Sequence, residues 1–274
     1  MVGIGARAAE LLERAEVGRV LAAMRGAIYI VVQGEVLWLA GPVDMLHRRA
    51  ILLSEPPEPS AFAAGDALAL PGFAMRAWRP DAPRRDAKAV AALRRGAGRL
   101  PIIGRGLGEP AGLGHWMLGY HLPSPLSYLK TIPLEFARAC TTDDAEAAID
   151  MAARLLGAGP GLTPSGDDFV GAAFFAREML VQMGGLDPGR WRDAALAVRA
   201  AAHGATNVIS ATLLDDLLDG HGWSSLHDLV AALAGEDEAA AVKAARRLTL
   251  LGDSSGWDLL AGLHAGARGV AGVR

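Results

Sequence analysis

The stretch Gly159-Pro-Gly-Leu-Thr-Pro-Ser-Gly-Asp-Asp168 holds three glycines, two prolines, two hydroxyls and two carboxylates, and the apolar run 169–176 follows it directly. Glycine permits positive φ and close backbone approach, and proline suits the first turn of a helix. The pattern therefore predicts a stiff loop that opens a buried helix. Free N–H groups and the positive end of the helix dipole make such a terminus a place for an anion, or for a carboxylate that holds a metal ion.

Helix capping explains part of this motif. Ser165 and Asp168 form S-x-x-D, which is close to a capping box, and Thr163 with Pro164 forms an N-cap and N1 pair. We expect at least one of these hydroxyls to cap the helix. Because the S-x-x-D spacing assigns the cap to Asp168, we expect Asp167 to matter more for function.

A second segment repeats the pattern near the C-terminus. Ser165-Gly-Asp-Asp168 corresponds in register to Ser255-Gly-Trp-Asp258, and each precedes an apolar helical run. If the match reflects a shared site, two helix N-termini meet at one pocket; otherwise each segment is an independent helix start.

These residues resemble a known family. The strings GPGLTPSGDDFVG (159–171) and GDSSGWDLLAG (252–262) are similar to the AllH-like family, as are Thr206 and Ser210, which we expect one turn apart on a helix in the wall of the pocket. One branch of that family is described as a subunit of oxamate carbamoyltransferase, which interconverts oxalurate plus phosphate with oxamate plus carbamoyl phosphate. The resemblance also covers the β-rich start and the helical end, and so most of the chain, but not residues 76–131. It implies a role in allantoin and purine catabolism, a small anionic metabolite as ligand and other carbamoyltransferase subunits as partners.

We predict a site for a small carboxylate- or phosphate-bearing ligand between residues 159–168 and 252–258, with main-chain N–H groups near Gly161, Gly166 and Gly256 holding the charge. Asp167 and Asp168 are the candidate catalytic residues, acting as caps and base in preference to holding a divalent cation such as Mg²⁺. No other cofactor and no dedicated metal site are predicted. The candidate substrate-binding residues are Gly159, Gly161, Thr163, Ser165, Gly166, Thr206, Ser210, Ser255, Gly256 and Asp258.

Two other functions stay open at this point, as does the question whether the chain is itself an enzyme. Residues 165–171 also resemble the G-A-G-D-x-F signature of ribokinase-like kinases, in which Asp167 would take a proton from the acceptor hydroxyl. That fold needs repeated strand–helix units before the motif, which the N-terminal half does not show. The other alternative is a non-catalytic subunit that binds a metabolite and needs a partner for chemistry.

Composition bounds the class of protein. Among 274 residues, 51% are hydrophobic and 21% charged, which excludes wholesale disorder. A net charge of −3 without a long basic run argues against nucleic acid as a partner. The single cysteine, Cys140, excludes an internal disulfide and a cysteine metal cage. With neither a signal-peptide pattern nor an apolar run long enough for a membrane, we expect a cytoplasmic protein without a membrane partner.

Periodicity predicts an α+β fold. Residues 1–80 form a small antiparallel β-rich part, a sheet or barrel, with strands at 27–32, 36–39, 50–53 and 67–70 and a tight turn at 33–35. Residues 81–140 form a Gly/Pro-rich connecting region with a helix at 86–95, and residues 96–114 form a linker or a loop that closes over a ligand. Residues 141–274 form an all-helical bundle that carries both motifs, with the first motif helix at its centre.

Overall fold

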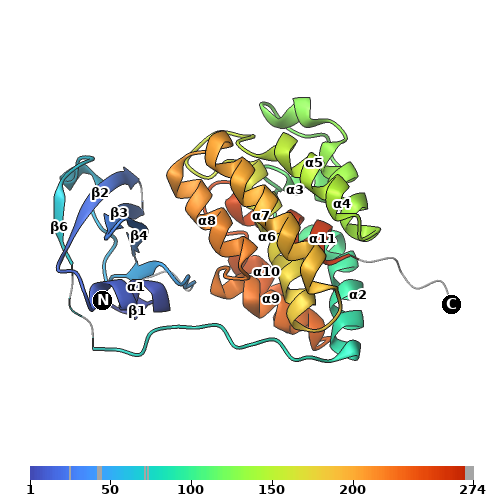
Figure 1. Ribbon diagram of the computed structural model, residues 1–274, viewed down its shortest axis with the longest axis horizontal. Helices are drawn as coiled ribbons and strands as arrows, with labels where there is room; N and C mark the ends of the chain where they lie inside the picture. The colour runs from blue at the N-terminus through green and yellow to red at the C-terminus, as the bar shows by residue number, and fades with distance from the viewer. Residues whose placement is uncertain (25, 42–44, 71, 73, 269–274) are drawn as a thin grey trace. The chain divides into compact units, whose positions relative to one another are not determined.

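The computed structural model describes residues 1–24, 26–41, 45–70, 72 and 74–268 (Figure 1). By internal contacts the chain divides into two compact units, Met1–Asp81 and Ala82–Arg274. The last six residues of the predicted helical bundle lie outside the described residues. No helix in the described ranges combines the length and the hydropathy needed to cross a membrane.

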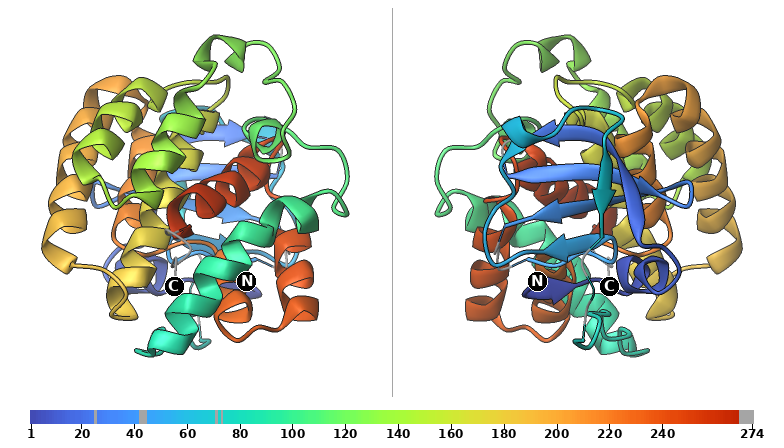
Figure 2. Two further views of the ribbon diagram at one scale, coloured as in Figure 1. Left: turned by 90° about the vertical axis from the view of Figure 1, so that its right-hand side faces the viewer. Right: turned by 90° about the vertical axis from the view of Figure 1, so that its left-hand side faces the viewer.

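Over its described residues, the first unit is a curled, mixed six-stranded sheet with one α-helix, so the predicted β-rich N-terminal part is confirmed (Figure 2). The strand order is β1-β5-β4-β3-β2-β6. The elements are β1 (Gly3–Ile4), α1 (Ala6–Leu12), β2 (Val17–Met24), β3 (Ala27–Val32), β4 (Glu35–Ala40), β5 (Ala50–Leu52) and β6 (Ala67–Ala69).

The predicted hairpin joins β3 and β4. Gln33 and Gly34 have φ of 51° and 84°, as a two-residue turn between twisted strands requires. Alternate β3 residues, Ile28, Ile30 and Val32, are buried in the core of this unit.

The prediction of a purely antiparallel sheet is wrong for one strand pair. β4 and β5 pair in parallel, with Trp38 opposite Ala50. Parallel neighbours cannot be joined by a tight hairpin, and residues 41–49 separate the two strands instead. The sequence pattern also missed β1 and β2; β2 contains few of the β-branched residues that mark a strand.

The second unit is helical, as predicted, with α6 near its centre (Figure 1). Sixteen residues of α6 are buried, so the helix is packed on nearly every side. The helices are α2 (Ala87–Gly104), α3 (Gly114–Met117), α4 (Ile132–Thr141), α5 (Ala145–Leu155), α6 (Ser165–Gln182), α7 (Pro188–Ala205), α8 (Val208–Leu218), α9 (Ser224–Ala234), α10 (Glu238–Leu248) and α11 (Ser255–Ala267).

The glycine-rich stretch after Arg95 is helical for much of its length, so the prediction of a linker or loop is wrong over residues 96–104. A Cβ at Gly96 would lie 2.8 Å from a methyl group of Leu233 in α9. Glycine at this position allows close helix packing and does not mark a flexible loop. A single sequence does not distinguish these two roles of glycine.

Two glycines bring α6 and α11 to backbone contact. A Cβ at Gly262 would lie 2.2 Å from the carbonyl oxygen of Phe169, and a Cβ at Gly266 would lie 2.1 Å from that of Ala173. Residues four apart share one helix face, so both glycines seat α11 directly on α6. This contact holds the starts of the two helices, and therefore the two motifs, side by side.

Candidate functional site

The structure brings the two motifs together through their hydroxyls. The Oγ1 atom of Thr163 lies 2.9 Å from Oγ of Ser255, and Oγ of Ser165 lies 3.4 Å from Oγ of Ser254. Pairing across the two helix starts is what the repeated pattern predicts for a shared site, and it is not the arrangement of two independent helix starts.

The two segments are also built alike. The Ser255 hydroxyl acts on Asp168 of the first motif and the Ser165 hydroxyl acts on Asp258 of the second, each lowering the pKa of that aspartate. Each motif thus supplies a serine to the aspartate of the other.

Gly166 and Gly256, which occupy equivalent positions in the two motifs, each allow a close contact with the preceding helix. A Cβ at Gly166 would lie 1.8 Å from the carbonyl oxygen of Leu155 in α5, and one at Gly256 would lie 2.0 Å from that of Leu248 in α10. Only glycine lets each helix start pass this close to the end of the preceding helix.

Asp168 and Asp258 form a buried pair at the centre of the site. Their exposed fractions are 3% and 0%, and one carboxylate oxygen of each, Oδ2, has no hydrogen-bond partner. Burial raises the pKa of Asp168 well above its usual value, the charge of Asp258 raises it further, and the Ser255 hydrogen bond opposes both effects.

Burial also raises the pKa of Asp258, to about 7, against hydrogen bonds from the Leu113 N–H (2.6 Å) and from the hydroxyls of Ser254 and Ser165. Two neighbouring carboxylates in a poorly solvated site disfavour double ionisation. The pair therefore holds a proton near neutral pH.

Asp167 has the opposite environment. Its Oδ1 accepts from the Gly157 N–H at 2.7 Å, and its Oδ2 accepts from the hydroxyls of Thr206 at 2.5 Å and Ser210 at 2.6 Å. Three donors stabilise this buried carboxylate and tie the end of α5 to α7 and α8. Both oxygens are occupied, whereas each aspartate of the pair keeps one oxygen without a partner.

Thr206 and Ser210 were expected one turn apart on a single helix, and this is wrong. Thr206 is the extended residue after α7, and α8 is capped by Asn207, whose side chain accepts from the N–H groups of Ile209 and Ser210. The two predicted pocket-wall residues nevertheless converge, with both hydroxyls directed at Asp167.

The capping prediction for the first motif is also wrong. No side chain caps α6, because the hydroxyls of Thr163 and Ser165 point to Ser255 and Ser254 instead. Asp168 does not act as the reciprocal acid of a capping box, since its partner is Ser255.

Two of the N–H groups predicted to bind an anion donate to backbone carbonyls instead. The Gly166 N–H donates to the Ala158 carbonyl at 2.8 Å, and the Gly256 N–H donates to the Leu251 carbonyl at 2.9 Å. The edge of the site that solvent reaches holds hydroxyls: Thr163, Ser254 and Ser255 are half-buried, and Gly161 beside them is exposed. Gly159, with φ of 114°, turns the loop so that it closes against Ser165.

The loop that covers Asp258 lies within the stretch predicted as a linker or a closing loop, but its contact with Asp258 was not predicted. A Cβ at Gly112 (φ 49°) would lie 2.2 Å from Oδ1 of Asp258, and the N–H of the next residue, Leu113, donates to that oxygen. The high number of glycines before residue 114 was the only feature of the sequence that pointed to this loop. Among the described residues, no group of three or more His, Cys, Asp or Glu side chains is placed to hold a metal ion.

Together these features define a helical domain in which two Ser-Gly-x-Asp helix starts face each other over a buried carboxyl pair. A sequence model of the family described as oxamate carbamoyltransferase subunit AllH matches residues 155–267. The match includes both motifs, and the resemblance to this family is confirmed over these residues. No curated protein and no solved structure matches the chain.

The hydroxyl contact between the motifs predicts energetic coupling. In a double-mutant cycle of Thr163→Ala and Ser255→Ala, we expect the effects on unfolding free energy to differ from additivity by about 0.5–1.5 kcal/mol, because the two hydroxyls hydrogen-bond each other. Chemical denaturation of the four proteins measures this. Additivity within about 0.3 kcal/mol would show that the contact contributes nothing.

Proposed function

We propose that the chain is a subunit of an oxamate carbamoyltransferase-type system, in which the paired helix starts bind the substrate and the pair Asp168–Asp258 supplies a proton. The match over residues 155–267 carries this proposal, because both aspartates and the hydroxyls around them lie in the matched range.

The chemistry of the reaction suits a carboxyl pair that retains a proton. A phosphate oxygen attacks the carbamoyl carbon of oxalurate, the bond from that carbon to the oxamate nitrogen breaks, and this nitrogen takes up a proton. A buried aspartic acid with a raised pKa is the type of group that donates such a proton near neutral pH. In the reverse direction the same pair accepts it.

Binding of the anionic substrate is assigned to the half-buried hydroxyls of Thr163, Ser254 and Ser255. A proton held between Asp168 and Asp258 lowers the repulsion that two carboxylates would exert on an anion beside them. In this proposal Asp167 has a positioning role, since it holds α6 against α7 and α8.

No observation favours the kinase alternative. Donors occupy both oxygens of Asp167, which leaves no free oxygen for a general base. The helices α4 and α5 precede the motif, in place of the strand–helix units that a ribokinase-like fold requires.

The test uses the full chain, tagged and purified with its associated subunits from the cells that produce it. Phosphate-dependent formation of carbamoyl phosphate from oxalurate is measured for wild type, Asp168→Asn and Asp253→Asn, which alters an exposed carboxylate in the second motif loop. We expect Asp168→Asn to lower turnover by about 100-fold or more with a nearly unchanged Tm, and Asp253→Asn to keep it within about twofold.

Calorimetry with oxalurate and oxamate separates the remaining outcomes. If the protein neither binds oxalurate or oxamate nor turns oxalurate over, the proposal is overturned. Binding without turnover, unaffected by Asp168→Asn, would overturn the proton-donor role and support the non-catalytic metabolite subunit.

A further inference from the structure

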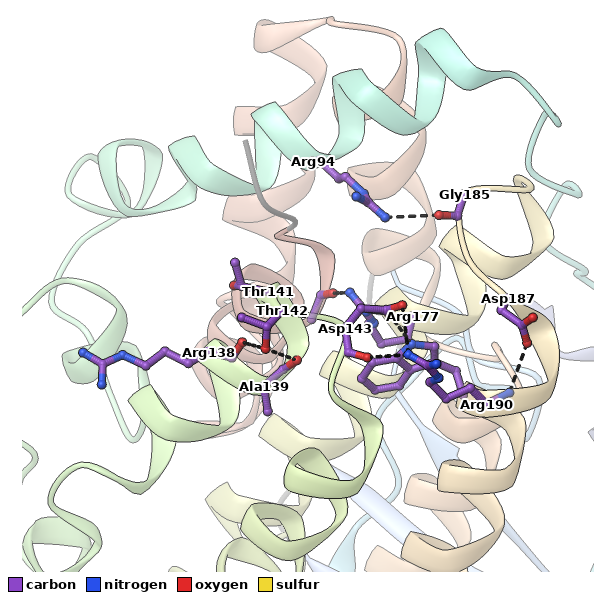
Figure 3. Close-up of polar contacts among 12 residues, drawn as sticks. Arg94, Arg138, Ala139, Thr141, Thr142, Asp143, Arg177, Gly185, Asp187 and Arg190 are labelled. Carbon is purple, nitrogen blue, oxygen red and sulfur yellow. Dashed lines mark hydrogen bonds and ion pairs between the residues drawn. The ribbon is translucent and has the colours of Figure 1, made fainter. Parts of the chain in front are cut away.

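A cavity lies in the helical unit at the C-terminal end of α6. Its volume is about 400 Å³, and its walls come from α2, from the turn between α4 and α5, from α6 and from the turn before α7 (Figure 3). Arg94, Arg177, Asp143 and Asp187 are the charged side chains that line it.

Arg177 is buried, with an exposed fraction of 1%. It donates to the Gly266 carbonyl at 3.1 Å and to Asp143 at 2.6 Å, and its guanidinium lies 4.0 Å from the centre of the Trp191 ring. Its Nε atom is buried and has no hydrogen-bond partner. A buried guanidinium with one donor unsatisfied is costly, and an acceptor in the cavity would remove that cost.

Arg94 reaches the same cavity from α2. It donates to the Gly185 carbonyl at 3.1 Å, while its Nε atom is buried without a partner. In the described part of the chain, no carboxylate lies within ion-pair distance of Arg94. The pKa of Arg177 is lowered first by burial and also by the positive charge of Arg94, so the two cations repel each other.

Both acids of the cavity already have partners, and neither forms an ion pair with Arg94. Asp143 is shared by Arg177, Arg190 and the indole N–H of Trp191, and Asp187 caps α7 by accepting from the N–H groups of Gly189 and Arg190. Burial raises the pKa of the Cys140 thiol to about 12, so this thiol adds no negative charge. The charge of Arg94 is therefore left without a counterion.

We propose that this cavity binds a small oxyanion, a phosphate or a carboxylate, between the unpaired Nε donors of Arg94 and Arg177. Guanidinium groups match the paired oxygens of phosphate and carboxylate. Arg177 lies twelve residues after Ser165 on the same helix, which is roughly 18 Å at 1.5 Å per residue. The site is thus distinct from the carboxyl pair and goes beyond the proposed carbamoyl transfer.

The competing explanation is structural: both arginines donate to carbonyls, at Gly185 and Gly266, and would then serve only to close the ends of helices. That explanation predicts no ligand. The two explanations are separated by titrating the full chain with inorganic phosphate and, separately, with oxalate, by calorimetry at low ionic strength.

Arg94 is the residue to change, because a variant of the fully buried Arg177 is at risk of not folding. Arg94→Gln removes the charge, Arg94→Lys restores it, and Arg95→Gln is the matched control, since Arg95 is exposed next to it on α2 and pairs with Glu236. We expect saturable binding of phosphate or oxalate to wild type, weakened about tenfold or more by Arg94→Gln, partly rescued by Arg94→Lys and unchanged within about twofold by Arg95→Gln.

Asp168→Asn identifies any anion binding at the carboxyl pair, and the binding assigned to the cavity is the part that Asp168→Asn leaves in place. Absence of saturable binding for both anions would overturn the proposal. So would binding that Arg94→Gln does not affect, or binding that Asp168→Asn abolishes while Arg94→Gln does not. None of these outcomes depends on whether carbamoyl transfer is found.

Discussion

Gly262→Val is expected to lower the unfolding free energy of the helical unit by about 3 kcal/mol or more. The new Cβ would fall 2.2 Å from the carbonyl oxygen of Phe169, so α11 must move away from α6 along the contact that holds both motifs together. Chemical denaturation followed by far-ultraviolet circular dichroism measures the loss of helix.

Gly98→Ala is the matched control for this substitution. Gly98 also lies within a helix, α2, but a Cβ there meets nothing within 4 Å. Alanine should therefore stabilise the protein by up to about 1 kcal/mol through helix propensity. Equal effects of the two substitutions, or a loss below about 1 kcal/mol for Gly262→Val, would contradict the close contact of α6 and α11.

Asp167→Ala is expected to cost about 3–5 kcal/mol of unfolding free energy, because it leaves three donors without their buried acceptor. Those donors are the Gly157 N–H and the hydroxyls of Thr206 and Ser210. Thermal and chemical unfolding of the purified variant measure the loss.

Asparagine substitutions sharpen the comparison of the two neighbouring acids. Asp167→Asn keeps the shape but removes one acceptor oxygen from a satisfied carboxylate, so it should destabilise by about 1–3 kcal/mol. Asp168→Asn should cost less, because burial already disfavours the charged form of Asp168. A larger loss for Asp168→Asn than for Asp167→Asn would reverse the roles assigned here.

Local pattern was enough to predict much of the fold. Helical spacing and the apolar run after Asp168 placed α6 at the centre of the bundle, and alternation with a Gln33-Gly34 turn predicted the β3–β4 hairpin. The repeat of Ser-Gly-x-Asp predicted that the starts of α6 and α11 meet. Each of these features depends on residues that are close together in the sequence, or on a pattern that occurs twice.

The roles of the acids could not be predicted in the same way. The S-x-x-D spacing describes a local cap, but the donors that occupy Asp167 come from Thr206 and Ser210, 39 and 43 residues away. The N–H that binds Asp258 comes from Leu113, 145 residues away. Such contacts depend on helix packing, and packing here depends on glycines that in the sequence look like loop residues, as at Gly96.

The central claim is that Asp258, buried beside Asp168, keeps a proton close to neutral pH in the folded protein. The pKa of Asp258 rises from an ordinary value of 3.8 to about 7 on folding, so between these values the folded state binds more protons than the unfolded state. Unfolding free energy must then decrease as pH rises through this window. The stabilisation is complete below the unfolded pKa and is lost once pH passes the folded pKa.

The most direct measurement is the unfolding free energy of wild type, Asp258→Asn and the exposed-site control Asp253→Asn at pH 5 and pH 8. Comparison between variants cancels the contribution of other titrating groups. The account predicts that wild type and Asp253→Asn lose about 2–3 kcal/mol more than Asp258→Asn between the two pH values. Equal pH dependence in wild type and Asp258→Asn would show that folding does not change the protonation of Asp258 between pH 5 and pH 8, and it would contradict the account.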